Sequence, residues 1–199
     1  METILTKIVN NWSESGFIEK SDEEIYVYGL DLLIFTILNM LAILITSVII
    51  NRFTESAILL ATIIPLQSYG GGYHAKTHLR CFLIMYIGWW GLMYIIPFIT
   101  SLVAFVMSVI SVVIIFCLAP VPHKNVKMST EHRLKLRTVI RIISLSIGLL
   151  SVALLLLFSN YHIQFGVLLS TGLGVTAFSM VVAHIVNKIH QNQLSKANR

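Results

Sequence analysis

The densest group of reactive side chains lies in the segment between residues 67 and 81, which contains His74 and Cys81. A cysteine must become a thiolate to attack a carbonyl carbon, and a nearby histidine can take its proton. On one continuous α-helix these two residues would share a face but lie about 10 Å apart along the axis, beyond hydrogen-bond reach. A cysteine–histidine pair therefore requires the chain to bend between them.

A helix that begins just after Thr77 would provide that bend, because threonine is a favourable N-cap residue. His74 would then lie on the preceding loop, and Cys81 would lie in the opening turns of the helix. The positive end of the helix dipole, together with Lys76 and Arg80, would favour the thiolate there. The spacing thus allows Cys81 as a nucleophile and His74 as its base.

Three glycines, Gly70 to Gly72, stand at the head of this segment. Glycine permits positive φ angles and close approach of the backbone, so the N–H groups of Gly71 and Gly72 could bind an anion or the carbonyl of a peptide. A flexible turn between two membrane segments explains the same glycines without any ligand. The sequence leaves both interpretations open.

The spacing also leaves other roles open for the histidines and the cysteine. His78 is a rival base three residues before Cys81. His74, His78 and Cys81 could instead line one helical face as metal ligands, although Ala75 stands where a zincin helix carries its glutamate base and no fourth ligand is evident. Cys81 could also be a packing cysteine beside an interfacial histidine. No bound metal and no cofactor are predicted.

The composition is that of an integral membrane protein. Of the 199 residues, 56% are hydrophobic and 12% are charged, and the mean hydropathy is +0.83, which excludes a water-soluble globular domain. We predict an all-α, polytopic fold with a single membrane domain over residues 1–199. Its surroundings are the lipid bilayer, and no nucleic-acid partner is expected.

About six transmembrane helices fit the hydrophobic profile. The predicted spans are 31–50, 57–66, 81–100, 102–119, 142–158 and 165–186. The second is too short for a comfortable span, so it is extended by polar flanks, tilted or re-entrant. Within residues 1–29, apolar side chains recur at helical spacing and predict an amphipathic helix in the membrane interface. These side chains are Ile4, Leu5, Ile8, Val9 and Trp12.

Lysine and arginine mark the cytoplasmic loops of membrane proteins, and they crowd the segment 120–141. This segment contains Glu131 as its single acid. Counting crossings outwards from a cytoplasmic 120–141 loop places both termini and the 67–81 segment on the cytoplasmic side. Of the fourteen basic residues, only Arg52 then lies outside.

A few residues inside the hydrophobic segments need separate interpretation. Cys117 lies in an uninterrupted apolar run and is predicted to be a small core residue. Asp31 is costly in lipid, so it either reaches the interface or has a function such as orienting His74. Small residues recur at four-residue spacing in the last span and predict a close helix–helix packing seam. They are Gly166, Ser170 and Gly174.

At Gly71-Gly72-Tyr73-His74-Ala75-Lys76 followed by Cys81, the chain resembles the accessory gene regulator protein B (AgrB) family of Gram-positive bacteria. Its length, amphipathic start, Ala119-Pro120 exit into a basic stretch and final hydrophobic hairpin also agree with that family. The resemblance implies a membrane-embedded cysteine endopeptidase in the bacterial cell membrane. It would cleave the C-terminal tail of a small AgrD-like propeptide through a thioester on Cys81, with His74 as base, on the way to a cyclic autoinducing peptide for quorum sensing.

Members of this family often carry basic residues just before the glycines, whereas this chain has Gln67 and Ser68 there. Other basic residues are therefore expected to bind an acidic propeptide, together with Gly71 and Gly72. These are Lys76, Arg80, Lys124, Lys127 and Arg133. The alternative from another functional class is a non-enzymatic membrane transporter or peptide-binding protein, which would tolerate loss of Cys81. A homodimer is among the expected assemblies.

Overall fold

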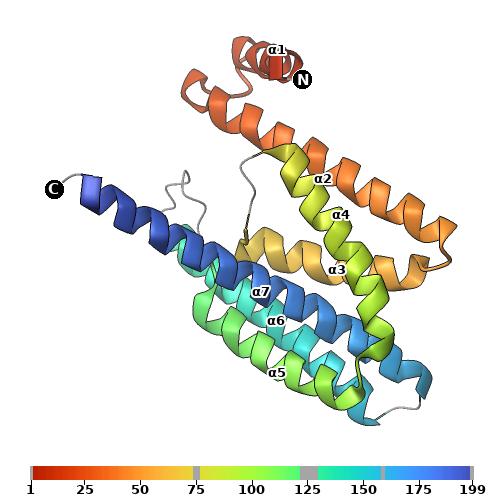
Figure 1. Ribbon diagram of the computed structural model, residues 1–199. Helices are drawn as coiled ribbons and strands as arrows, with labels where there is room; N and C mark the ends of the chain where they lie inside the picture. The colour runs from red at the N-terminus through yellow and green to blue at the C-terminus, as the bar shows by residue number, and fades with distance from the viewer. Residues whose placement is uncertain (1, 74–76, 122–129, 158–159, 198–199) are drawn as a thin grey trace.

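Figure 1 shows the computed structural model, which describes residues 2–73, 77–121, 130–157 and 160–197. All regular elements in these residues are helical, as predicted. The seven α-helices are α1 (Glu2–Glu14), α2 (Glu23–Ile49), α3 (Phe53–Gly70), α4 (His78–Ile95), α5 (Ser101–Leu118), α6 (Thr130–Leu157) and α7 (Asn160–Ala197). Short 3-10 turns precede α2 (Lys20–Asp22) and follow α4 (Ile96–Phe98).

Five of these helices are long and apolar enough to cross a membrane, namely α2, α4, α5, α6 and α7. The multi-pass membrane fold is therefore confirmed. The short second span predicted at 57–66 forms the middle of α3, which polar residues extend at both ends and which is not among the five. Whether α3 crosses the membrane, and hence the side on which each terminus lies, stays a prediction.

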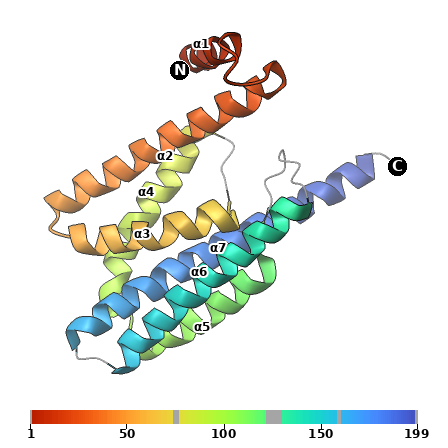
Figure 2. The same cartoon turned by 180° about the vertical axis from the view of Figure 1, so that it is seen from behind.

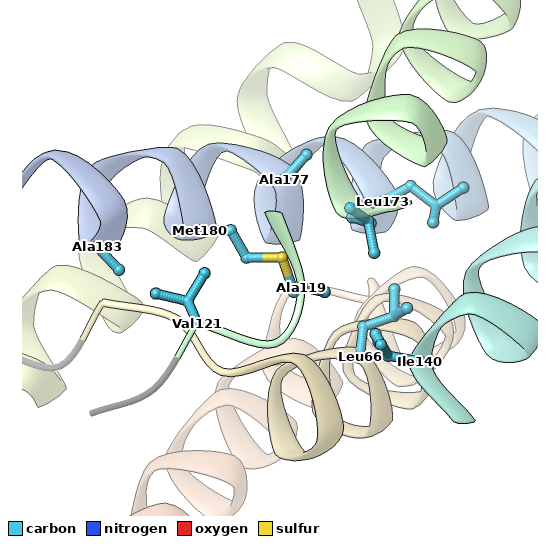
Figure 3. Close-up of a cluster of buried hydrophobic side chains, with 9 residues drawn as sticks. Leu66, Ala119, Val121, Ile140, Leu173, Ala177, Met180 and Ala183 are labelled. Carbon is cyan, nitrogen blue, oxygen red and sulfur yellow. The ribbon is translucent and has the colours of Figure 1, made fainter. Parts of the chain in front are cut away.

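Helix α7 is the centre of the fold. It packs against α3, α5 and α6 (Figures 1 and 2). Of the apolar part of α7 that could span a membrane, 56% is buried inside the protein. The main core cluster brings Leu173 and Met180 of α7 together with Leu66 of α3, Ile115 of α5 and Ile140 of α6. Figure 3 shows part of this cluster.

The predicted packing seam of α7 is confirmed. The Ser170 and Ser151 hydroxyls are 2.6 Å apart, and Ser151 of α6 also donates a hydrogen bond to the carbonyl oxygen of Gly166. A Cβ at Gly166 would lie 2.8 Å from the Leu155 side chain. Small residues thus let α6 and α7 approach closely, as is common between membrane helices.

Helices α2 and α4 lie beside the α5–α7 bundle (Figures 1 and 2). They are joined to it mainly through α3 and through a second core cluster that includes Leu168 of α7. Asn39 Nδ2 of α2 lies 3.1 Å from Met85 Sδ of α4. Trp89 of α4 donates a hydrogen bond of 3.0 Å to the Ser56 hydroxyl of α3. Only 6% of the apolar part of α4 that could span a membrane is buried, which is the smallest share among the five candidate spans.

The amphipathic helix predicted near the N-terminus is α1. Leu5 and Val9 are buried where α1 packs against α2, whereas Ile4, Ile8 and Trp12 remain exposed. The apolar face is therefore divided between the protein and its surroundings. Exposed apolar side chains on such a helix suit a membrane interface, which remains a prediction for α1.

Candidate functional site

The first turn of α4 positions Cys81. Thr77 has extended backbone angles, φ −134° and ψ 146°, and its hydroxyl accepts a hydrogen bond of 3.4 Å from the Arg80 amide. The predicted N-cap is therefore confirmed. The Cys81 amide donates to the Thr77 carbonyl at 3.0 Å, so the half-buried thiol lies at the end of the first helical turn. The helix that carries Cys81 does not extend back to His74.

Several predicted site residues lie outside the described residues. These are His74, Lys76, Lys124 and Lys127. His78 is the first residue of α4, and Arg80 is exposed in the same turn. Among the residues that the structure describes, no three His, Cys, Asp or Glu side chains gather as metal ligands do. The pairing of Cys81 with His74 thus stays a prediction.

The glycines end α3 in a turn that packs against the segment after α5. Gly71 has φ +73°, a conformation that side chains other than glycine rarely adopt, and its amide donates to the Gln67 carbonyl at 2.9 Å. The Gly70 carbonyl accepts a hydrogen bond of 2.9 Å from the Val121 amide. A Cβ at Gly71 would collide with the Val121 carbonyl oxygen. Close backbone approach explains this glycine without a ligand.

Ser179 of α7 fixes the next part of the turn. Its hydroxyl accepts a hydrogen bond of 3.0 Å from the Tyr73 amide, and a Cβ at Gly72 would lie 2.8 Å from the same oxygen. The residue directly before His74 is therefore anchored to the central helix. The amides of Gly71 and Tyr73 are both committed within the protein, so neither is a free donor for a substrate.

Sequence reasoning missed the roles of Val121 and Ser179. Val121 follows the Ala119-Pro120 exit, and Ala119 and Val121 are both buried in the main core cluster beside Met180 (Figure 3). The exit of α5 and the glycine turn thus form one packed junction. Ser179 is one of several serines on apolar helices, and nothing in its sequence surroundings distinguishes it.

The start of α6 and the end of α5 form the walls of an open groove of ≈ 430 Å³. Arg133 and Arg137 line it from α6, and Cys117 lines it from α5. The prediction that Cys117 is a core residue is wrong, because its side chain is exposed. Cys117 is two positions beyond the buried Ile115, about 200° around the helix, and therefore faces away from the core.

Comparison with known proteins identifies a family. The family model described as Accessory gene regulator B matches residues 1–182, which include the glycine turn, α4 and the α5 exit. No curated protein and no solved structure matches the chain.

Proposed function

Because the chain belongs to the accessory gene regulator B family, we propose that it is a membrane-embedded cysteine endopeptidase that removes the C-terminal tail of a small AgrD-like propeptide. Membership of the family implies a part in processing the peptide of agr quorum sensing, and the five apolar helices agree with a multi-pass membrane protein. The observation that carries the finer assignment is the half-buried thiol of Cys81 in the first turn of α4.

The first step transfers the acyl group of the propeptide to Cys81. His74 takes the thiol proton, the sulfur attacks the scissile carbonyl, and the peptide bond breaks to leave a thioester. The proton goes from His74 to the amine of the departing tail. A thiol or hydroxyl inside the remaining peptide then attacks the thioester, loses its proton to His74 and closes the ring, which regenerates the Cys81 thiol. Exclusion of water prevents wasteful hydrolysis of the thioester.

The start of α4 supports His74 as the base. A histidine on the loop before a helix can approach the first turn without the axial separation that a continuous helix would impose. Because α4 begins at His78, His74 precedes the helix that carries Cys81 and is not separated from it by helical rise. The metal alternative needs His74, His78 and Cys81 on one helical face, and α4 does not provide such a face. His78 stays the rival base.

Charge supports an acidic substrate on the cytoplasmic side. Arg80 is exposed beside Cys81, and the basic residues between α5 and α6 follow directly on the packed junction with the glycine turn. Lys124 and Lys127 are expected to attract the acidic tail. The cytoplasmic location of this site and of both termini follows from the positive-inside rule and belongs to the proposal.

Mass spectrometry of a candidate propeptide co-expressed with the protein tests this function. We expect cleavage with the wild type, none with Cys81→Ala or His74→Ala, and full cleavage with the matched control Cys117→Ala. A propeptide whose ring nucleophile is replaced by alanine should accumulate as an acyl adduct on Cys81. Cleavage by Cys81→Ala would return the non-enzymatic or metal-dependent alternatives, and inhibition by chelators would favour the latter.

A further inference from the structure

The groove between α5 and α6 contains two positive charges that the protein leaves unused. Arg133 and Arg137 lie one helical turn apart on the same face of α6, and both are exposed. Within the described residues, neither makes an ion pair or a side-chain hydrogen bond. Glu131, the acid of this segment, is bound to Lys135 at 2.8 Å. The groove is therefore electropositive.

Arg141, one turn further along α6, shows the contrast. Its Nη2 donates to the Phe116 carbonyl at 3.1 Å, and its guanidinium lies 3.9 Å from the centroid of the Phe116 ring. This arginine joins α6 to α5. The two arginines before it have no such contact and remain available to a ligand.

The groove also lies at the edge of the apolar layer. The candidate span of α5 ends at Leu118, and the candidate span of α6 begins at Arg133. From Cys117, exposed apolar side chains continue along one face of α5 toward the interior of the membrane. They are Val113, Ile110 and Val106, which are 57%, 53% and 46% exposed. A charged end therefore adjoins an apolar track.

We infer that this groove binds an anionic phospholipid. The two guanidinium groups suit a phosphodiester, because arginine binds phosphate oxygens through paired N–H donors. An acyl chain can then lie along the exposed face of α5, and basic pockets between membrane helices are a known form of lipid site. An acidic peptide tail matches the arginines but has nothing to place against the apolar track. Arg133 then binds the lipid, whereas Arg80, Lys124 and Lys127 attract the propeptide.

Cys117 makes the site measurable. The chain has two cysteines, so the full-length Cys81→Ser variant carries its single thiol in the groove. Its alkylation by a water-soluble maleimide would be timed in neutral detergent micelles that contain phosphatidylglycerol, phosphatidylcholine, inorganic phosphate or a synthetic acidic peptide. We expect phosphatidylglycerol to slow labelling and the other three to leave the rate unchanged.

Arg133→Gln/Arg137→Gln should weaken phosphatidylglycerol binding about 30-fold, given the usual contribution of basic residues beside anionic lipid. Lys188→Gln, which removes an exposed charge on α7 outside the groove, is the control and should keep full protection. Native mass spectrometry of the wild type should show retained phosphatidylglycerol. Any of four results would overturn the inference: equal protection by phosphatidylcholine, protection by inorganic phosphate, protection by the acidic peptide, or retained phosphatidylglycerol binding in the double variant.

Discussion

The Val121 amide donates a hydrogen bond of 2.9 Å to the Gly70 carbonyl, and this contact joins the exit of α5 to the end of α3. Both partners lie in segments that the sequence singles out for different reasons, one for its glycines and one for its Ala-Pro exit. The contact brings these two features together in space. The turn before Cys81 depends on a segment far away along the chain.

Replacing Gly71 with alanine should destabilise the protein by about 2 kcal/mol or more. The new Cβ would meet the Val121 carbonyl oxygen, and the backbone has φ +73°. Thermal unfolding in mild detergent measures the effect. Two controls separate its causes. Gly16→Ala has a similar φ of +76° in open space and should cost about 1 kcal/mol, while Gly88→Ala, with nothing within 4 Å, should be neutral or slightly stabilising. Equal losses at Gly71 and Gly16 would contradict the contact.

Ser179→Ala should slow propeptide cleavage roughly two- to tenfold, because the Tyr73 amide loses its acceptor and the loop before Cys81 loses its anchor. The fall should appear in kcat, with KM and the unfolding temperature little changed. Ser146→Ala, an exposed serine on α6, is the control. A loss of stability with unchanged kcat would reduce Ser179 to a packing role.

The hydrogen bond from Trp89 to Ser56 should contribute about 1 kcal/mol to stability. Trp89→Phe, Ser56→Ala and the double variant form a double-mutant cycle, and unfolding in detergent gives the coupling energy. Trp90→Phe changes the neighbouring tryptophan, which is 44% exposed, and should have little effect. Additive losses at Trp89 and Ser56 would show that α4 does not depend on this bond.

Charge reversal of Lys124 and Lys127 should weaken propeptide binding about tenfold at low salt, with the difference shrinking as salt is raised. Lys20→Glu, far from this stretch in sequence, is the control. Unchanged binding would dispose of the electrostatic role of these lysines. Arg133→Glu separates the two assignments of that arginine, because the phospholipid site predicts no change in peptide binding.

Local patterns predicted much of this fold. The Thr77 cap, the amphipathic α1 and the small-residue seam of α7 each depend on neighbouring residues or on helical periodicity, and each is present. The contacts that hold the glycine turn were not predictable, because Val121 and Ser179 reach it from distant segments. Cys117 was misplaced for a related reason. An apolar run has no polar face, so its periodicity does not reveal which side turns toward the protein.

The shallow attachment of α4 gives the site a mechanical asymmetry. Tyr73, next to the proposed base, is tied to α7, the most buried of the five candidate spans, whereas Cys81 belongs to α4, the least buried. Most of α4 faces away from the rest of the protein, and its buried residues Trp89 and Met93 lie in a cluster with residues of α2, α3 and α7. The two members of the proposed catalytic pair therefore have unequal support: the loop before His74 is tied to the most enclosed candidate span, whereas Cys81 lies on the candidate span most open to its surroundings.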